Sequence, residues 1–450
     1  MKKWMLVYDT YCRAVQKMYA VVSPYLDYNL ICSTEEDSNF NIIRLSVQPN
    51  TEGLTVNVSE NDGENQRIEI TGQDEIYLLY GVVDFKNIYL PYAEDAGQHN
   101  PVYYFHPLFS KPFKPYKYTA KAMIKERGIW LWGYTVYDYR RFIDNMTELK
   151  LNTLIIWNDY LPLNISDVIS YAHINGIKIY LGYSWGWDDQ QCDKLEELVA
   201  KPSIARISED IIREYELKYA DLNCDGIYFQ SFTEHTIDTV NGVVIAEAVV
   251  DLVNRTAARL LEKHPDIKLL FGLHAGSVIN RLDVIKTVNP KVSVIWEDAG
   301  AFPYNYSPAR VEDFDQTLAL NNQLQNLRDS GGFGAVLKGN ICLDWSRFEH
   351  LRGNYIMGVA EKEYINQRTE RQKKILRYTQ AYWIKNAEYA LRLIQELREG
   401  AIITCLVEDG MFENLINYPI ALCAQMLWDS NRSVDDILCQ TALMPCVDFV

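Results

Sequence analysis

Two groups of carboxylates follow apolar runs that have the composition of buried strands. Glu234 comes shortly after the run at residues 225–230. The run at residues 292–296 leads directly into Glu297 and Asp298. Cleavage of a glycosidic bond requires such a pair, because one carboxyl gives a proton to the leaving oxygen while the other attacks the anomeric carbon or activates water. We interpret Glu234 as a candidate general acid and Glu297 or Asp298 as its partner, and a salt-bridged surface role is the alternative.

Tryptophan recurs at or near the ends of the predicted strands. Its flat amphipathic ring can stack on the apolar face of a sugar while its N–H group donates a hydrogen bond. Polar residues that could bind sugar hydroxyls follow several of the same strands, and Asp344 is a reserve for the second carboxylate. We interpret these positions as one binding cleft, and ordinary core packing of the rings is the alternative. The candidate substrate-binding residues of this pattern are Trp132, Trp157, Asn158, Asp159, Trp185, Trp187, His235, His274, Trp296, Tyr304 and Asp344.

Two other chemistries fit the sequence less well. His235 and His274 could bind a metal ion together with Glu234, but barrel metallohydrolases use clustered histidines with an H-x-H pair, which this sequence lacks. Residues 330–338 imitate a glycine-rich nucleotide loop without its third glycine in register, and no P-loop motif is present. We therefore expect neither a metal ion nor a cofactor.

The stretch from residue 127 to residue 187 predicts the architecture that positions these side chains. It alternates apolar strands at residues 128–132, 152–157 and 177–182 with helical segments. Two successive strand–helix units indicate parallel strands wound in one direction, and a (β/α)8 barrel gathers its functional residues at the carboxyl ends of such strands. The remaining predicted strands lie at residues 225–230, 267–273, 292–296, 334–337 and 401–406.

The amino-terminal part of the chain predicts a different module. Residues 1–92 read as a small α/β domain with an antiparallel sheet, opened by a helix over about residues 4–21. A proline-containing linker at residues 93–119 precedes the catalytic barrel with its closing helices at residues 120–450. The charged helical segment at about residues 361–396 is either an extended barrel helix or the surface of a homodimer.

Composition narrows the classes of partner and the cellular compartment. A net charge of −16 disfavours a nucleic acid or an anionic membrane as the partner. Nine scattered cysteines without a C-x-x-C pair favour a reduced, cytoplasmic setting over a disulfide framework. No apolar stretch reaches the length of a membrane span. A carbohydrate substrate is the partner that we expect.

Short motifs resemble one group of enzymes. Arg127 with Gly128, residues 139–146 and residues 149–152 resemble the opening of β-N-acetylhexosaminidase barrels. That resemblance implies that Arg127 binds sugar hydroxyls and that the glutamate after the fourth strand, Glu234, is the general acid. Residues 78–81 are similar to the end of the amino-terminal domain of hexosaminidases and α-glucuronidases, and residues 418–421 and 427–429 are similar to the closing helices of that group.

Two departures limit what the resemblance implies about the sugar. Thr233 stands where hexosaminidases that use the substrate's acetamido group carry an aspartate. In α-glucuronidases the base comes from late strands, where Glu297 or Asp298 is comparable, but the fuller motif around the acid is missing. The resemblance therefore implies a glycoside hydrolase, exo-acting on short oligosaccharides of hexosaminide or uronide type. A non-catalytic carbohydrate-binding barrel is the alternative, and a metal-dependent hydrolase is the third interpretation.

Overall fold

The structure is a computed structural model, and the stretches that it describes fall into two compact units. One unit comprises Met1–Ala122 with Ile174–Gly176 and Cys439–Asp448, and the other comprises Met123–His173, Ile177–Leu438 and Phe449–Val450. For residues 298–299 and 410–411 the backbone alone is described. The described residues are 3–26, 28–60, 65–93, 113–132, 136–157, 161–186, 199–231, 237–274, 278–299, 314–329, 331–338, 361–407 and 410–450.

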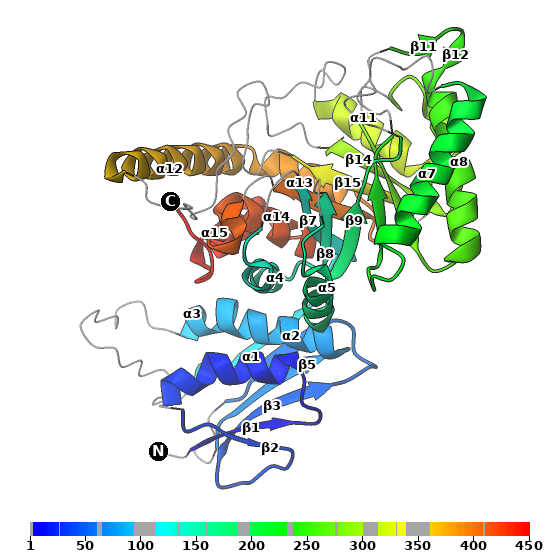
Figure 1. The fold of residues 1–450 in the computed structure, drawn as a ribbon. Coiled ribbons are helices and arrows are strands. Elements are labelled where there is room, and N and C mark those ends of the chain that lie inside the picture. Colours follow the sequence, from blue (N-terminus) through cyan, green and yellow to red (C-terminus); the bar gives the residue numbers. More distant parts are fainter. Residues whose placement is uncertain are drawn as a thin grey trace. The chain divides into compact units, whose positions relative to one another are not determined.

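The first unit is built on a six-stranded sheet in the order β2-β1-β3-β5-β4-β6. The strands β2, β1, β3 and β5 run parallel, and β5, β4 and β6 pair antiparallel, so the expected α/β domain with antiparallel strands is confirmed as a mixed sheet. Helices α1 (Arg13–Val22) and α2 (Glu75–Asp84) cover one face of the sheet (Figure 1). The strand bounds are β1 (Trp4–Tyr8), β2 (Ile31–Ser33), β3 (Asn41–Val47), β4 (Leu54–Val58), β5 (Arg67–Gly72) and β6 (Tyr116–Ala120).

Two expectations about this unit are wrong. Trp4–Tyr8 is a central strand and not the start of a helix, because its first four side chains are all buried, which leaves no polar face for a surface helix. Residues 116–119 were expected in a linker and residue 120 at the start of the barrel, but β6 (Tyr116–Ala120) pairs with β4 along its whole length. The unit therefore extends to Ala122.

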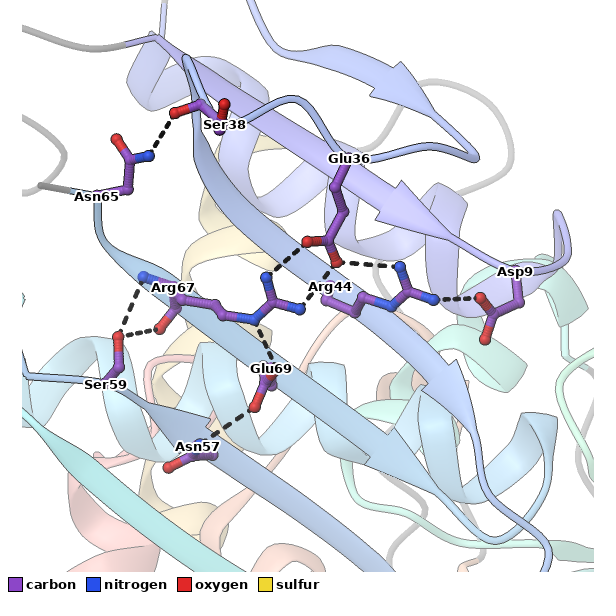
Figure 2. Close-up of polar contacts among 9 residues, drawn as sticks. All are labelled: Asp9, Glu36, Ser38, Arg44, Asn57, Ser59, Asn65, Arg67 and Glu69. Atoms are coloured by element: carbon purple, nitrogen blue, oxygen red, sulfur yellow. Dashed lines mark hydrogen bonds and ion pairs between the residues drawn. The ribbon is translucent and has the colours of Figure 1, made fainter.

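A chain of charged side chains crosses the face of this sheet opposite the helices (Figure 2). Glu36 accepts hydrogen bonds from Arg44 at 3.0 Å and from Arg67 at 2.7 and 2.8 Å. Arg44 also pairs with Asp9, and Arg67 also pairs with Glu69, each at 2.6 Å. Hydrogen bonds from Arg67 lower the pKa of Glu36 despite partial burial. The network holds the segment between β2 and β3 on the sheet, although half-exposed pairs contribute little stability individually.

The second unit is a closed barrel of eight parallel strands in the cyclic order β10-β13-β14-β15-β16-β7-β8-β9. Its closure comes from the parallel pairs between β16 and β7 and between β9 and β10. All eight predicted strands are present, so the predicted (β/α)8 barrel is confirmed. The strand bounds are β7 (Glu126–Trp132), β8 (Thr153–Trp157), β9 (Lys178–Gly182), β10 (Gly226–Phe229), β13 (Lys268–Leu273), β14 (Val292–Ala299), β15 (Phe333–Leu337) and β16 (Ile402–Val407).

Helix ends follow local chemistry. Asp138 caps α4 by accepting a hydrogen bond from the Arg141 backbone at 3.0 Å, and Gly176, with φ of 71°, follows the end of α5. The segment expected as one helix at residues 361–396 divides at Asn386 into two. The remaining bounds are η1 (Ser23–Leu26), η2 (Phe85–Tyr89), α3 (Leu90–Ala93), α4 (Tyr139–Glu148), α5 (Ile165–Ile174), α7 (Lys201–Lys218), β11 (Thr239–Val240), β12 (Val243–Val244), α8 (Ile245–Lys263), α10 (Leu282–Ile285), α11 (Phe314–Gln325), α12 (Lys362–Lys385), α13 (Ala387–Gln395), η6 (Gly410–Glu413), α14 (Tyr418–Trp428) and α15 (Val434–Leu443).

Side chains fill the barrel interior in layers, as in other barrels of this type. At the amino end, Glu126 binds Lys178 at 2.8 Å, Lys268 at 2.6 Å and the hydroxyl of Tyr180 at 2.9 Å. Burial raises the pKa of the Glu126 carboxyl, but the two lysines lower it overall. Above this ionic layer lies an apolar layer formed by Trp130, Ile155, Tyr180, Tyr228, Leu270, Ile295, Val336, Ile402 and Leu406.

We predict that Glu126→Ala destabilises the barrel by roughly 1–3 kcal/mol, because three donors lose their buried acceptor. Since the pKa of Glu126 lies below its ordinary value of 4.5, this contribution is present above that pH and disappears as the pH falls through the folded-state pKa. Chemical unfolding of both proteins at neutral pH and near pH 3 measures the effect. Glu209→Ala, which removes an exposed partner of Arg259, is the control and should leave stability unchanged. Equal stability of Glu126→Ala and wild type at neutral pH would contradict the prediction.

Candidate functional site

Two half-buried indole rings lie side by side at the carboxyl ends of β7 and β8. Trp132 and Trp157 are partners in the strand register, and both pack against the apolar layer of the barrel. The ring of Trp157 lies over Gly182, where an added methyl group would come within 2.6 Å of its Cε3 atom. It also meets the ring of Tyr228 edge to face, at 5.7 Å between centroids. The missing side chain on β9 thus leaves room for an aromatic surface at the barrel mouth.

Across the barrel from these rings, Glu297 places a carboxylate in the interior. Its side chain is 1% exposed. The amide of Gln230 donates to both carboxylate oxygens, at 2.7 and 2.6 Å, and the hydroxyl of Tyr228 donates to Oε1. Nε2 of His274 lies 2.8 Å from Oε2. Three side chains from two neighbouring strands therefore surround one carboxylate.

The charge of Glu297 follows from this environment. Burial raises the pKa of its carboxyl, but the positive charge and hydrogen bond of His274, the hydroxyl of Tyr228 and the charge of Lys338 lower it overall. Burial, reinforced by the negative charge of Glu297, raises the pKa of Tyr228 well above its ordinary value. Glu297 is therefore an ionised acceptor at neutral pH, and Tyr228 is a permanent donor to it.

The alternation of side chains along parallel strands explains why these residues meet. Leu270 on β13 and Ile295 on β14 point into the barrel. Because side chains alternate along a strand, Gly272 and His274, two and four positions after Leu270, also face inward, and so does Glu297, two positions after Ile295. The register pairs Leu273 with Trp296, which sets His274 beside Glu297. At Gly272 a methyl group would overlap both Oε1 of Glu297 and the hydroxyl of Tyr228, so glycine leaves the space in which they meet.

The backbone is irregular at the residue that carries this carboxylate. Trp296 is paired with Ala335 and Ala299 with Leu337, so β14 has one residue more than β15 between these two pairs. Such a bulge redirects the strand that carries it. It comprises the backbone of Glu297 and Asp298, which together lie opposite Val336.

The structure contradicts the expected roles of two tryptophans. The ring of Trp185 is fully buried and stacks on Phe229 at 3.6 Å between centroids. Trp296 lies between two inward-pointing residues, so its ring turns outward, where it is 1% exposed. Neither ring can stack on a sugar in this structure. A tryptophan inside a strand reaches the barrel mouth only if it stands at one of the alternate positions whose side chains point into the barrel.

Arg127 also lies in a different place from the one that the resemblance implied. It is the second residue of β7 and therefore belongs to the amino end of the barrel. Its Nη1 donates to the carbonyl oxygens of Ile124 and Lys125, at 3.1 and 3.4 Å, and its guanidinium lies 4.8 Å from the ring of Trp428. These contacts are structural, so we do not retain Arg127 as a sugar-binding residue.

Several predicted site residues lie outside the described part of the chain, and they remain predictions. Among the described residues, no group of three His, Cys, Asp or Glu side chains is placed to hold a metal ion. In the same part of the chain, no helix is long and apolar enough to cross a membrane. The residues outside the description are Asn158, Asp159, Trp187, Glu234, His235, Tyr304, Asp344 and the side chain of Asp298.

The sequence analysis missed three side chains that meet or face the carboxylate. Tyr228 and Gln230 belong to one predicted strand, two positions apart, and Lys338 directly follows another. Tyr228 looked like ordinary core because it stands in an apolar run. The sequence did offer a signal for them. Tyr228 and Gln230 are two positions apart and therefore lie on the same face of their strand, and Lys338 stands at the end of another strand.

Comparison with known proteins gives structural but not sequence relatives. The sequence matches no family model and no curated protein. A GH20 β-N-acetylhexosaminidase from Streptomyces coelicolor A3(2) superposes with a TM-score of 0.55 at 12% identity, covering 100% of this chain and 94% of its own. CpGH84D gives 0.51 at 11% identity, covering 97% and 68%. A GH138 enzyme targeting pectin rhamnogalacturonan II gives 0.53 at 10% identity, covering 96% of this chain and 51% of its own.

At these identities the comparisons define the fold. The chain has the barrel and amino-terminal domain architecture found in solved hexosaminidase-like structures, so the resemblance to that group of barrels is confirmed at the level of fold. The function has to be argued from the site.

We predict that Gly272→Ala displaces the Glu297 carboxylate and destabilises the protein by about 1–3 kcal/mol, the usual effect of an extra carbon in a filled interior. A crystal structure and a chemical unfolding curve of the variant measure both effects. The matched control is Gly81→Ala in α2 of the first unit, where an added methyl group meets a side-chain methyl of Ile70 at 2.5 Å. An unchanged position of Glu297 would contradict the prediction.

Proposed function

We propose that this chain is a glycoside hydrolase. The observation that carries the proposal is the ionised carboxylate of Glu297, held inside the carboxyl end of a (β/α)8 barrel beside two half-buried indole rings. An oxocarbenium-like transition state develops positive charge, which a fixed carboxylate stabilises without reorganisation. The indole rings supply the flat apolar surface on which a pyranose stacks. The structural relatives, among them a GH20 β-N-acetylhexosaminidase and a GH138 enzyme targeting pectin rhamnogalacturonan II, agree with this chemistry.

The proposed roles of the carboxylates differ. Glu234, after the fourth barrel strand, is the general acid that gives a proton to the leaving oxygen. The ionised partner comes from the sixth strand, as Glu297 or Asp298. The low pKa of Glu297 suits the partner and not the acid, since an acid must hold its proton at working pH.

The substrate class that we propose is a short oligosaccharide, cleaved from one end. Hexosaminides and uronides are both included, because Thr233 departs from the motif of substrate-assisted hexosaminidases. Assay of wild-type protein against chromogenic α- and β-glycosides, including N-acetylhexosaminides and uronides, tests the proposal. Saturable sugar binding without turnover of any of them would instead identify a non-catalytic carbohydrate-binding barrel.

We predict that Glu234→Gln lowers turnover at least ~10²-fold on a glycoside with a poor leaving group, because the amide keeps the shape but has no acidic proton. Activated aryl glycosides need little protonation, so their turnover should fall much less. Steady-state kinetics on both substrates measure the contrast. Glu247→Gln, an exposed glutamate in the first turn of α8, is the control and should change neither rate. An equal loss on both substrates would point to binding, and undiminished activity would exclude Glu234 from the mechanism.

We predict that Trp157→Ala weakens sugar binding by ~1–3 kcal/mol, because the ring provides stacking surface at the barrel mouth. Calorimetric titration with the sugar identified in the glycoside assay measures the loss. Tyr378→Ala on α12, where the ring is 65% exposed, is the matched aromatic control and should bind normally. Unchanged affinity in Trp157→Ala would remove that ring from the site.

A further inference from the structure

The side chain of Tyr228 contacts both parts of the proposed site. Its ring meets the ring of Trp157 edge to face, at 5.7 Å between centroids, and its hydroxyl donates to Oε1 of Glu297. The same ring packs against that of Trp130, at 5.6 Å between centroids. Tyr228 thus extends from the indole ring that is proposed to stack on the sugar to the carboxylate that is proposed to stabilise its positive charge. One side chain therefore joins the two.

Packing leaves the hydroxyl of Tyr228 little freedom. The residue is 0% exposed, and two indole rings contact its ring. The space in which the hydroxyl meets Oε1 of Glu297 exists because Gly272 has no side chain. A donor that is fixed before the reaction stabilises a charge without reorganisation. The packing of Tyr228 therefore helps to determine how the Glu297 carboxylate is oriented.

The chemistry of the two groups determines the direction of their hydrogen bond. Burial and the negative charge of Glu297 raise the pKa of Tyr228 well above its ordinary value, so the phenol keeps its proton. An ionised carboxylate can only accept hydrogen bonds, so Tyr228 is the donor. A hydrogen bond to the charged form of a carboxyl favours that form. Loss of the hydroxyl would therefore disfavour ionised Glu297 and remove one of its anchors.

We propose that Tyr228 is the positioning residue of Glu297, and that Glu297 is the carboxylate that stabilises the positive charge developing on the sugar ring. This inference rests on the proposed function and selects Glu297 over Asp298 as the ionised partner. Tyr228 acts through its neighbours: its ring supports Trp157, and its hydroxyl holds Oε1 of Glu297. The ring should thus influence the affinity for substrate, and the hydroxyl should influence the rate.

Other groups also act on Glu297, and the test has to separate them from Tyr228. Among the described residues, the amide of Gln230 donates to both carboxylate oxygens, Nε2 of His274 lies 2.8 Å from Oε2, and the positive charge of Lys338 favours the ionised form. An imidazole ordinarily titrates between about pH 5 and pH 8, so a rate profile alone would not identify the titrating group. The carboxyl carbon resonance of Glu297 in isotope-labelled protein, assigned by its loss in Glu297→Gln, reports the protonation of that carboxyl directly.

The decisive variant removes the hydroxyl and keeps the ring. In the full-length protein, with the best glycoside from the substrate screen, Tyr228→Phe should lower kcat at least ~10-fold and leave KM within about twofold, because a hydrogen bond to a charged group is lost while the contact with Trp157 remains. The acid limb of the rate profile and the titration of the Glu297 carboxyl should both move to higher pH, since the ionised form has lost a donor.

A second variant keeps both the ring and the hydroxyl. Tyrosine fluorinated beside its hydroxyl is a stronger donor of nearly the same shape, so its incorporation at position 228 should move the acid limb and the carboxyl titration to lower pH. The two variants thus change the profile in opposite directions, which a general loosening of the core would not do. The fluorinated protein also decides the matter if Tyr228→Phe does not fold.

Tyr180→Phe is the matched control. Tyr180 is also 0% exposed, and its hydroxyl donates to a carboxylate, that of Glu126, at 2.9 Å. Each of the two tyrosines has a glycine as its register partner on the neighbouring strand. Because Glu126 lies at the amino end of the barrel, Tyr180→Phe should change neither kcat nor the pH profile, whatever its effect on the melting temperature.

The contrary outcomes are equally definite. If Tyr228→Phe leaves kcat and both titrations unchanged, or if Tyr180→Phe lowers kcat to the same extent, Tyr228 is not a positioning residue, although the protein is a glycoside hydrolase. If Glu297→Gln keeps kcat within about threefold, Glu297 is not the ionised partner and the inference fails, while the proposed function remains with Asp298. A wild-type protein that cleaves no glycoside would overturn the proposed function and this inference together.

Discussion

Burial of a charged carboxylate is the interaction on which the arrangement of this barrel depends. An isolated carboxylate in an apolar interior is very costly, so it persists only where neighbours supply donors and positive charge. For Glu297 the donors are the side chains of Tyr228 and Gln230, and the imidazole of His274 and the charge of Lys338 lie nearby. Four barrel strands carry or lead into these residues, which ties their registers to one another. A slip of one strand by one residue would turn its contribution outward.

The same constraint divides the barrel interior into regions of different character. Glu126 and its two lysines form an ionic layer at the amino end, a layer of apolar side chains follows, and the Glu297 cluster forms the polar layer at the carboxyl end. Tyr180 and Tyr228 join these layers, because each has its ring in the apolar layer and its hydroxyl on a carboxylate. The two tyrosines allow charge to be buried at both ends of one hydrophobic core.

The fold could be predicted largely from the sequence, because strands covered on both faces appear as short apolar runs separated by helical periods. The uninterrupted apolar character of these strands also caused the wrong assignments of individual residues. An apolar run does not tell which of its residues point inward, so Trp296 was assigned to the cleft while Tyr228 was overlooked. Arg127 was misplaced because a short motif does not define the end of the strand to which it belongs. Trp4–Tyr8 was mistaken for a helix because a buried strand lacks the alternation that marks an exposed one.

The carboxyl ends of the strands could also be predicted as the location of the site, since strand direction and the alternation of side chains determine them. Glu297 was found in this way. The spacing of Tyr228 and Gln230 indicates that both point the same way, but not that they meet Glu297, because contacts across the interior depend on which registers pair and on where glycine leaves space, as at Gly272. Such relations join β10, β13 and β14, which are separated by helices along the chain. Patterns within a short window of sequence do not contain them.

The ionic layer around Glu126 has a consequence for molecular traffic. Because that layer and the apolar layer above it fill the amino half of the barrel, the described strands and their side chains leave no passage through that half of the interior. Under the proposed function, water, the incoming glycoside and both departing fragments would therefore share the entrance at the carboxyl ends of the strands. In such a blind chamber a fragment that leaves slowly obstructs the arrival of the next molecule, so the residence time of the retained sugar sets a ceiling on turnover.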